Sequence, residues 1–184
     1  MRRLGLLLAC SLLLAGCGSS DPRSAAPKSA RAERAALAGA PAPLAALHRQ
    51  ANQLLGGGAD AFKARLRGLR GRPVVVNKWA SWCPPCRGEF PFFQRQALAR
   101  GKRVAFLGVD SNDNDGDARR FLRKLPLTYP SYRDPQLGIA AQFHGVQAFP
   151  TTAFYDSRGR LAFVHLGGYA TERRLAADIE RYAR

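Results

Sequence analysis

The chain is 184 residues long with a formal net charge of +16, long enough for one domain with a hydrophobic core plus a shorter segment. The basic residues are scattered rather than gathered in one motif, so we expect no nucleic-acid partner. The charge is typical of a solvated basic surface, and it would also attract the chain to anionic lipid headgroups.

The N-terminus has the build of an export signal. A short basic segment, Met1-Arg2-Arg3, precedes an uncharged apolar run from Leu4 to Ala15, which is too short to span a bilayer as a helix. The run ends in Leu-Ala-Gly-Cys, which resembles the lipobox of bacterial lipoproteins. The resemblance implies that residues 1–16 are a signal peptide and that Cys17 carries a diacylglycerol. The alternative is an ordinary signal followed by an incidental cysteine.

The next segment predicts a spacer between the membrane and a folded domain. Residues 17–42 are rich in Ala, Ser, Pro, Gly and Arg and contain no aromatic residue, which is typical of a flexible tether. We expect residues 43–184 to form one domain. It begins with a short amphipathic helix over residues 43–55, because leucines recur there at helical spacing, and three glycines end that helix.

From residue 73 onward, predicted strands and helices alternate. Four segments of apolar or alternating residues predict strands: residues 73–79, 104–109, 151–155 and 161–166. Four segments predict helices: residues 84–100, 117–125 with Asp117 as its cap, 136–143, and a last one with the stripe Leu175, Ile179 and Tyr182. This order predicts an α/β fold with a mixed central sheet flanked by helices on both faces.

Two cysteines follow the first of these strands, one helical turn apart. Cys83 and Cys86 form a Cys-x-x-Cys pair, which is typical of a redox dithiol. We expect Cys83 at the N-terminus of the following helix, where the helix dipole and free amide groups favour a thiolate nucleophile. Cys86 is then one turn deeper and resolves the mixed disulfide. Pro84 and Pro85 suit a first helical turn, where their missing N–H groups cost little.

Other uses of the cysteines fit the pattern less well. A structural zinc site needs four ligands, and the histidines His48, His144 and His165 are widely spaced. Covalent haem attachment needs a histidine directly after Cys86, where this chain has Arg87. A purely structural disulfide is also disfavoured, because closing so short a loop adds little stability. The acidic run around Asp113 fails as a calcium loop, because a leucine stands where a glutamate is needed. We therefore expect no metal and no cofactor.

The segment from Arg72 to Arg87 resembles the active-site region of the thioredoxin superfamily, specifically its TlpA/ResA-like membrane-tethered branch. A second signature, Phe149-Pro150-Thr-Thr, matches the cis-proline loop of that family. The resemblance covers roughly residues 60–184 and implies a thioredoxin-like fold. It also implies that the main chain of Phe149 pairs with the substrate and that Pro150 shapes the groove. We assign substrate binding to Trp82, Pro84, Pro85, Phe149 and Pro150.

Two further positions bear on the chemistry. Thioredoxin has a buried Asp at the position of Asn77, whereas ResA-like proteins resemble this chain in carrying a Glu three residues after the second cysteine, here Glu89. Glu89 is a candidate to take the proton from Cys86, or it merely complements the helix N-terminus. Lys78 departs from the family, which has an apolar residue there. It must find a partner, either near Glu89 or near a thiolate.

The resemblance implies a membrane-anchored extracytoplasmic thiol–disulfide oxidoreductase, acting as a reductant of protein disulfides and serving cytochrome c maturation. Its expected partners are disulfide-containing exported proteins and a membrane thiol electron donor of the CcdA/DsbD type, with the protein itself a monomer on the bacterial cell membrane. Two alternatives remain open: a disulfide-introducing oxidase and a thiol-based copper chaperone.

Overall fold

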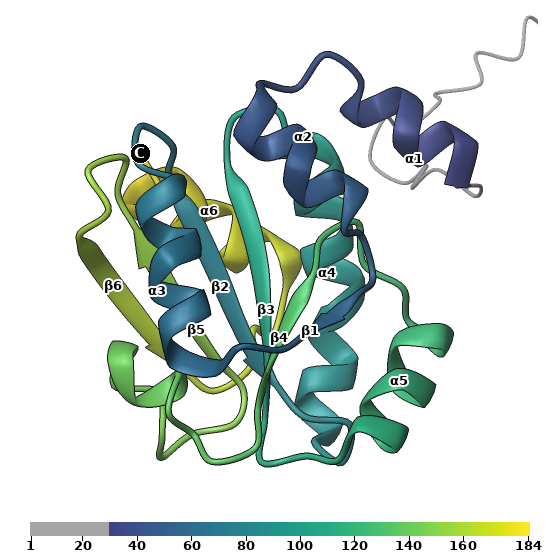
Figure 1. Cartoon of the computed structure of the whole chain (residues 1–184), viewed down its shortest axis with the longest axis vertical. Coiled ribbons are helices and arrows are strands. Elements are labelled where there is room, and N and C mark those ends of the chain that lie inside the picture. Colours follow the sequence, from purple (N-terminus) through teal and green to yellow (C-terminus); the bar gives the residue numbers. More distant parts are fainter. Residues whose placement is uncertain (1–29) are drawn as a thin grey trace, which may run out of the picture.

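A computed structural model describes residues 30–184, so the expected signal peptide, Cys17 and the first part of the expected tether lie outside the described residues. Six strands form one mixed sheet in the order β1-β4-β3-β2-β5-β6 (Figure 1). Their bounds are β1 Leu54–Leu55, β2 Val74–Trp79, β3 Ala105–Ser111, β4 Ser131–Asp134, β5 Thr151–Tyr155 and β6 Leu161–Leu166. The predicted α/β fold with a mixed sheet is confirmed.

The central strands are buried on both faces because helices cover both. Every residue of β2 and β3 is buried, as expected for parallel strands inside such a sheet. β5 runs antiparallel to β2 and forms the predicted hairpin with β6. β2 therefore lies at the centre, and its carboxyl end feeds directly into the segment with the two cysteines.

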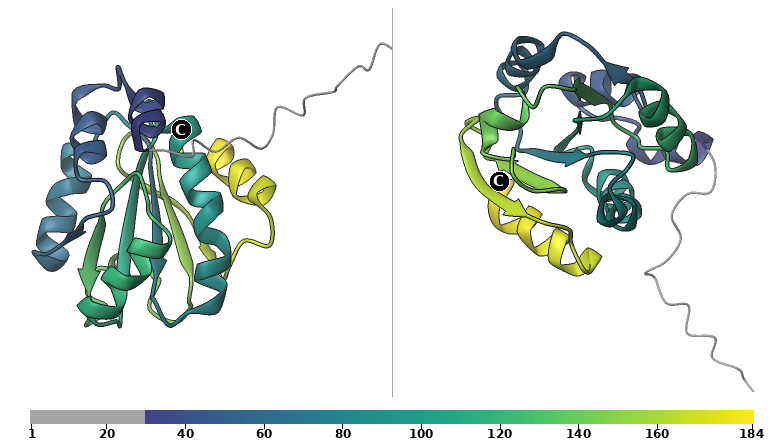
Figure 2. Two further views of the ribbon diagram at one scale, coloured as in Figure 1. Left: turned by 90° about the vertical axis from the view of Figure 1, so that its right-hand side faces the viewer. Right: turned by 90° about the horizontal axis from the view of Figure 1, so that it is seen from below.

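The helices form two layers around this sheet. Their bounds are α1 Ala30–Leu37, α2 Ala42–Arg49, α3 Gly58–Gly68, α4 Pro84–Arg100, α5 Asp115–Lys124, the 3₁₀ helix η1 Ala140–Phe143 and α6 Glu172–Tyr182. α2 and α3 lie on one side of the sheet, and α4 and α6 lie on the other (Figure 2). Two separate apolar clusters result. The cluster on the α4 side contains both cysteines.

The helix predicted over residues 43–55 is wrong in its second half. α2 ends at Arg49, and Asn52 adopts φ 60° while its N–H donates to the Tyr129 carbonyl oxygen. This turn leads into β1, whose two leucines pair with the start of β4. The glycines that follow do not simply end a helix, since Gly57 in the left-handed region caps the start of α3.

Part of the predicted tether is helical. Within residues 30–42 the chain forms α1 and begins α2, and Leu37 of α1 is buried. Glu33 accepts a hydrogen bond from Gln94 of α4 at 3.0 Å. The composition that suggested a tether also favours helix, because Ala, Glu and Arg are strong helix formers. The domain therefore begins before residue 43.

Smaller boundary errors have local causes. Asn114, not Asp117, caps α5, because the Asn114 side chain accepts the Asp117 N–H at 2.9 Å. The helix predicted over residues 136–143 shrinks to η1. β4 was not predicted, because its four residues contain no apolar run.

No helix in residues 30–184 is long and apolar enough to cross a bilayer.

Candidate active site

Cys83 and Cys86 lie at the start of α4, as predicted. Cys83 is the N-cap residue, and its sulfur accepts the Cys86 N–H at 3.2 Å. The two residues are joined by a disulfide with their Cα atoms 5.3 Å apart. Cys83 is 2% exposed and Cys86 is fully buried, so Cys86 is the deeper of the two. An amide directed at the Cys83 sulfur, together with the helix dipole, stabilises negative charge there once the disulfide opens.

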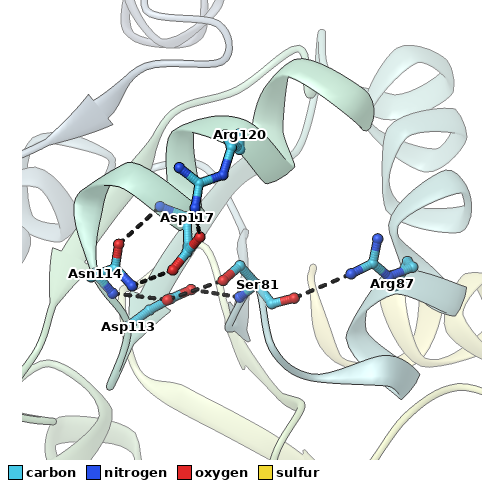
Figure 3. Close-up of polar contacts among 6 residues, drawn as sticks. All are labelled: Ser81, Arg87, Asp113, Asn114, Asp117 and Arg120. Carbon is cyan, nitrogen blue, oxygen red and sulfur yellow. Dashed lines mark hydrogen bonds and ion pairs between the residues drawn. The ribbon is translucent and has the colours of Figure 1, made fainter.

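The loop before the cysteines is tied to the end of the neighbouring strand. The Ser81 N–H and hydroxyl both donate to the carboxylate of Asp113, and Arg87 donates to the Ser81 carbonyl oxygen at 3.3 Å (Figure 3). The same figure shows the cap of α5 beside it, with Asp117 bonded to Asn114 and paired with Arg120. The acidic run that failed as a calcium loop thus fixes the position of the dithiol loop.

Asp110 is a second carboxylate at this edge of the sheet. It is buried, and one of its oxygens has no partner among the described residues. Burial, together with the nearby carboxylates of Asp113 and Asp115, raises its pKa to about 8 against the opposing charge of Arg133. The sequence offered no signal for this residue, because one Asp at a strand end is common.

The predicted cis-proline loop lies beside the first turn of α4. The Phe149–Pro150 bond is cis, and the Pro150 carbonyl oxygen accepts the Gly167 N–H at 2.9 Å. A Cβ placed on Gly168 would lie 3.4 Å from Pro85 Cβ and 3.7 Å from Pro150 Cγ. The first turn of α4, the cis-proline loop and the segment after β6 therefore meet at one place.

Aromatic side chains border this meeting point. The rings of Trp82 and Phe149 lie 4.7 Å apart, and the Trp82 indole N–H donates to the Asn112 carbonyl oxygen at 2.8 Å. Trp82 is 52% exposed, and Pro84 and Pro85 are also exposed. The five residues assigned to substrate binding thus gather at the start of α4, where the exposed Trp82, Pro84 and Pro85 offer apolar surface to a partner.

Glu89 is buried one turn after Cys86 on the inner side of α4. Its Oε1 accepts the Asn77 side-chain N–H at 2.6 Å, and its Oε2 accepts the Tyr169 N–H at 3.1 Å. Burial raises its pKa to about 7, and the hydrogen bonds from Tyr169 and Asn77 work against that rise. Its oxygens bond to β2 and to the segment before α6 rather than to the first-turn amides, so it does not complement the helix N-terminus.

Other groups near Glu89 were missed by the sequence analysis. Tyr169 is buried, and its hydroxyl donates to Asp178 at 2.8 Å. Tyr129 is fully buried, and burial raises the pKa of its phenol, with the Glu89 charge adding to the rise. Thr152 pairs with Asn77 across β5 and β2. Thr152 belongs to the cis-proline signature, but no sequence pattern indicated that it, Tyr129 or Tyr169 would lie near Glu89.

Lys78 does not lie near Glu89, which corrects one of the two expected positions. Neighbouring residues of a strand point to opposite faces, so Asn77 turns toward α4 and Lys78 turns away. The Lys78 ammonium donates to the carbonyl oxygens of Gly145 and Ala148, and it lies 3.5 Å from the ring centroid of Phe149. Burial lowers its pKa to about 8, against the opposing charge of Asp134.

Metal-ligand groups are sparse in the described part of the chain. Among residues 30–184, no three or more His, Cys, Asp or Glu side chains are placed to hold a metal ion together. The ring of His165 stacks on Tyr169 at 4.1 Å, which gives it a packing contact.

A protein-family model described as the AhpC/TSA family matches residues 39–164, more than half of the sequence. The chain belongs to the AhpC/TSA family. This AhpC/TSA-family chain is 30% identical over 104 residues to the thiol-disulfide oxidoreductase ResA of Halalkalibacterium halodurans, covering 56% of this chain and 58% of ResA. It is 28% identical over 141 residues to the thiol:disulfide interchange protein DsbE of Pasteurella multocida, covering 74% of this chain and 70% of DsbE.

A solved structure agrees with these relatives. The DsbF homologue of Corynebacterium diphtheriae is 32% identical with a TM-score of 0.58, covering 63% of this chain and 75% of that chain. The thioredoxin-like fold and the resemblance to ResA-type thiol–disulfide oxidoreductases are thereby confirmed. The chain spans less than two thirds of the length of the ResA relative.

Proposed function

We propose that the protein is a thiol–disulfide oxidoreductase that reduces disulfide bonds in exported proteins, with Cys83 and Cys86 as its redox pair. The observation that carries the proposal is the placement of the Cys83 sulfur, which caps α4 and accepts the Cys86 N–H in a helical turn that adjoins the cis-proline loop. This is the arrangement that a thiolate nucleophile needs, with an apolar rim on which a polypeptide can lie.

The reaction follows from the depth of the two sulfurs. The Cys83 thiolate attacks a substrate disulfide, which forms a mixed disulfide and releases one substrate thiolate. Cys86 then gives its proton to Glu89 and attacks the Cys83 sulfur, which releases the second substrate thiol. Two electrons pass to the substrate, and the Cys83–Cys86 disulfide remains. A second dithiol must reduce that disulfide before the next cycle.

The site of action belongs to the same proposal. We place the protein outside the cytoplasmic membrane, held by a lipid on Cys17 after cleavage of residues 1–16, and reduced by a membrane thiol carrier of the CcdA/DsbD type. Apocytochrome c before haem attachment is the substrate that the TlpA/ResA-like resemblance implies. Cys17→Ala is expected to move the protein from the membrane fraction to the soluble fraction.

Insulin reduction tests the chemistry. The wild-type protein is expected to accelerate insulin reduction by dithiothreitol, and Cys83→Ser is expected to abolish the acceleration. Cys86→Ser is expected to accumulate a mixed disulfide with a disulfide-containing peptide, seen by mass spectrometry, because the resolving thiol is gone. An acceleration that is absent, or that Cys83→Ser leaves intact, would rule out the proposal.

The direction of electron flow is tested separately. Redox titration against dithiothreitol and glutathione gives the reduction potential of the pair, where about 30 mV corresponds to 1.4 kcal/mol. A reductant is expected at a potential near that of thioredoxin, about −270 mV. A potential near the strongly oxidising end, about −120 mV, would assign the protein as a disulfide-introducing oxidase instead.

A further inference from the structure

Lys78 is a charged side chain enclosed in the centre of the sheet. It is fully buried, and its ammonium reaches across to the loop between η1 and β5. There it donates to the carbonyl oxygens of Gly145 at 2.5 Å, Ala148 at 2.9 Å and Val146 at 3.3 Å. A buried ammonium needs such acceptors, and it uses all three of its donors on one short loop.

The same ammonium lies under the residue before the cis-proline. Its nitrogen is 3.5 Å from the centroid of the Phe149 ring, a close cation–π contact. The other neighbour of that ring is Trp82, next to Cys83. Lys78 therefore links the centre of β2 to the aromatic pair beside the sulfurs.

Phe149 has a main chain available to a partner. It precedes β5, and within residues 30–184 neither its N–H nor its carbonyl oxygen makes a hydrogen bond. An exposed main-chain segment with free donors and acceptors can pair with an extended polypeptide, as a sheet edge does. Ala148, the residue before Phe149, accepts hydrogen bonds from the Lys78 ammonium at 2.9 Å and from the Thr151 hydroxyl at 2.8 Å. Lys78 therefore helps to fix the position of this segment.

We propose that Lys78 is a positioning residue that presents the main chain of Phe149 to polypeptide substrates, and so sets the preference of the dithiol for disulfides in extended chains. The inference rests on the proposed reductase function. An apolar residue at this place would fill the space but leave the carbonyl oxygens of Gly145 and Val146 without this donor, and the Phe149 ring without its cation. The Ala148 carbonyl oxygen would keep only its hydrogen bond from the Thr151 hydroxyl. Lys78 touches neither sulfur, so it acts on substrate alignment and not on the chemical step.

The test compares two disulfides with the same protein. Reduced wild-type and Lys78→Met proteins are assayed with insulin, whose disulfides lie in a polypeptide, and with 5,5′-dithiobis(2-nitrobenzoate), which has no main chain to pair. We expect the KM for insulin to rise about tenfold in Lys78→Met, with its kcat little changed. The rate with the small disulfide and the reduction potential are expected to stay at the wild-type values.

Two further variants separate positioning from general damage. Leu44→Ala removes a buried α2 side chain from the apolar cluster on the same side of the sheet and leaves the hydrogen bonds of Lys78 in place, so it is expected to lower stability but to affect both substrates equally. If Lys78→Met does not fold, Lys78→Gln keeps an amide donor without the charge and takes its place. A Lys78 variant that slows both disulfides alike, or neither, would overturn the inference. A wild-type protein that reduces neither would overturn the proposed function itself.

Discussion

At the scale of single residues, Asn77 and Glu89 together occupy the place where thioredoxin has a single buried Asp. Asn77 cannot take a proton at neutral pH, but its amide holds Glu89 Oε1 at 2.6 Å. Glu89 remains inside an apolar cluster, where burial raises its pKa to about 7. A carboxyl group that titrates near neutral pH can both accept and return a proton during thiol exchange.

Glu89→Gln is therefore expected to slow the resolving step and to remove one ionisation from its pH dependence. In the wild-type protein the single-turnover rate should rise as pH increases through about 7, where Glu89 loses its proton. The variant should be slower by about 10²-fold at pH 8, within the usual range for loss of a general base. Stopped-flow tryptophan fluorescence measures the rate. An unchanged pH–rate profile would show that Glu89 has only a structural role.

At the scale of elements, the close contact between β3 and β4 determines where the last residue of β2 packs. Trp79, the last residue of β2, packs its ring on Phe90 and Phe121 and donates its indole N–H to Ser131 at 3.2 Å. Gly108 of β3 lies against Ser131, and a Cβ there would collide with the Ser131 hydroxyl. The end of β2, which leads to Cys83, therefore packs in place only because Gly108 of β3 has no side chain.

Gly108→Ala is expected to destabilise the fold by about 1–3 kcal/mol, because the new methyl group must displace Ser131 and Trp79. Urea unfolding monitored by tryptophan fluorescence gives the free energy of unfolding. Gly68→Ala is the matched control, since it lies in α3 with nothing within 4 Å of the added methyl group and should be neutral or slightly stabilising. Equal effects of the two changes would contradict the packing argument.

These two scales also show what could be predicted from the sequence. β2 and the β5–β6 hairpin were predictable from their apolar runs and the turn residues between them, and α4 from the prolines of its first turn and the glycine at its end. The dithiol and Pro150 were identified by motif. β1 and β4 could not be predicted, because strands of two and four residues are too short to show a periodic pattern. The contacts of Lys78 could not be predicted either, because the identity of a residue does not indicate its partners in the fold. Tyr169 is positioned only by tertiary folding, since it meets Glu89 across 80 residues.

At the scale of the whole molecule, burial of two carboxyl groups makes the stability depend on pH. The pKa of Glu89 is raised to about 7 and that of Asp110 to about 8, both above the values expected in an unfolded chain. The folded state therefore binds more protons than the unfolded state between pH 4 and pH 8. The stability from these groups is fully present below their unfolded pKa and is lost as pH rises through the folded pKa.

The free energy of unfolding is accordingly expected to fall between pH 5 and pH 8, with Glu89 contributing up to about 3 kcal/mol of the change. Glu89→Gln and Asp110→Asn should each flatten this slope, as measured by urea unfolding at a series of pH values. The variants are needed because His48 and Lys78, whose pKa values are lowered by burial, contribute changes of opposite sign. A slope that both variants leave intact would mean that the two carboxyl groups are ionised in the folded state.

The contact of α1 with α4 determines where the chain enters the domain. Glu33 and Leu37 contact the later turns of α4, so the chain enters the domain at the opposite end from Cys83 (Figure 1). α4 has 17 residues and is about 25 Å long. The lipid anchor proposed on Cys17 would join the domain at the end away from the sulfurs. An electron donor embedded in the bilayer would then reach the sulfurs only in an orientation that brings this far end of the domain to the membrane.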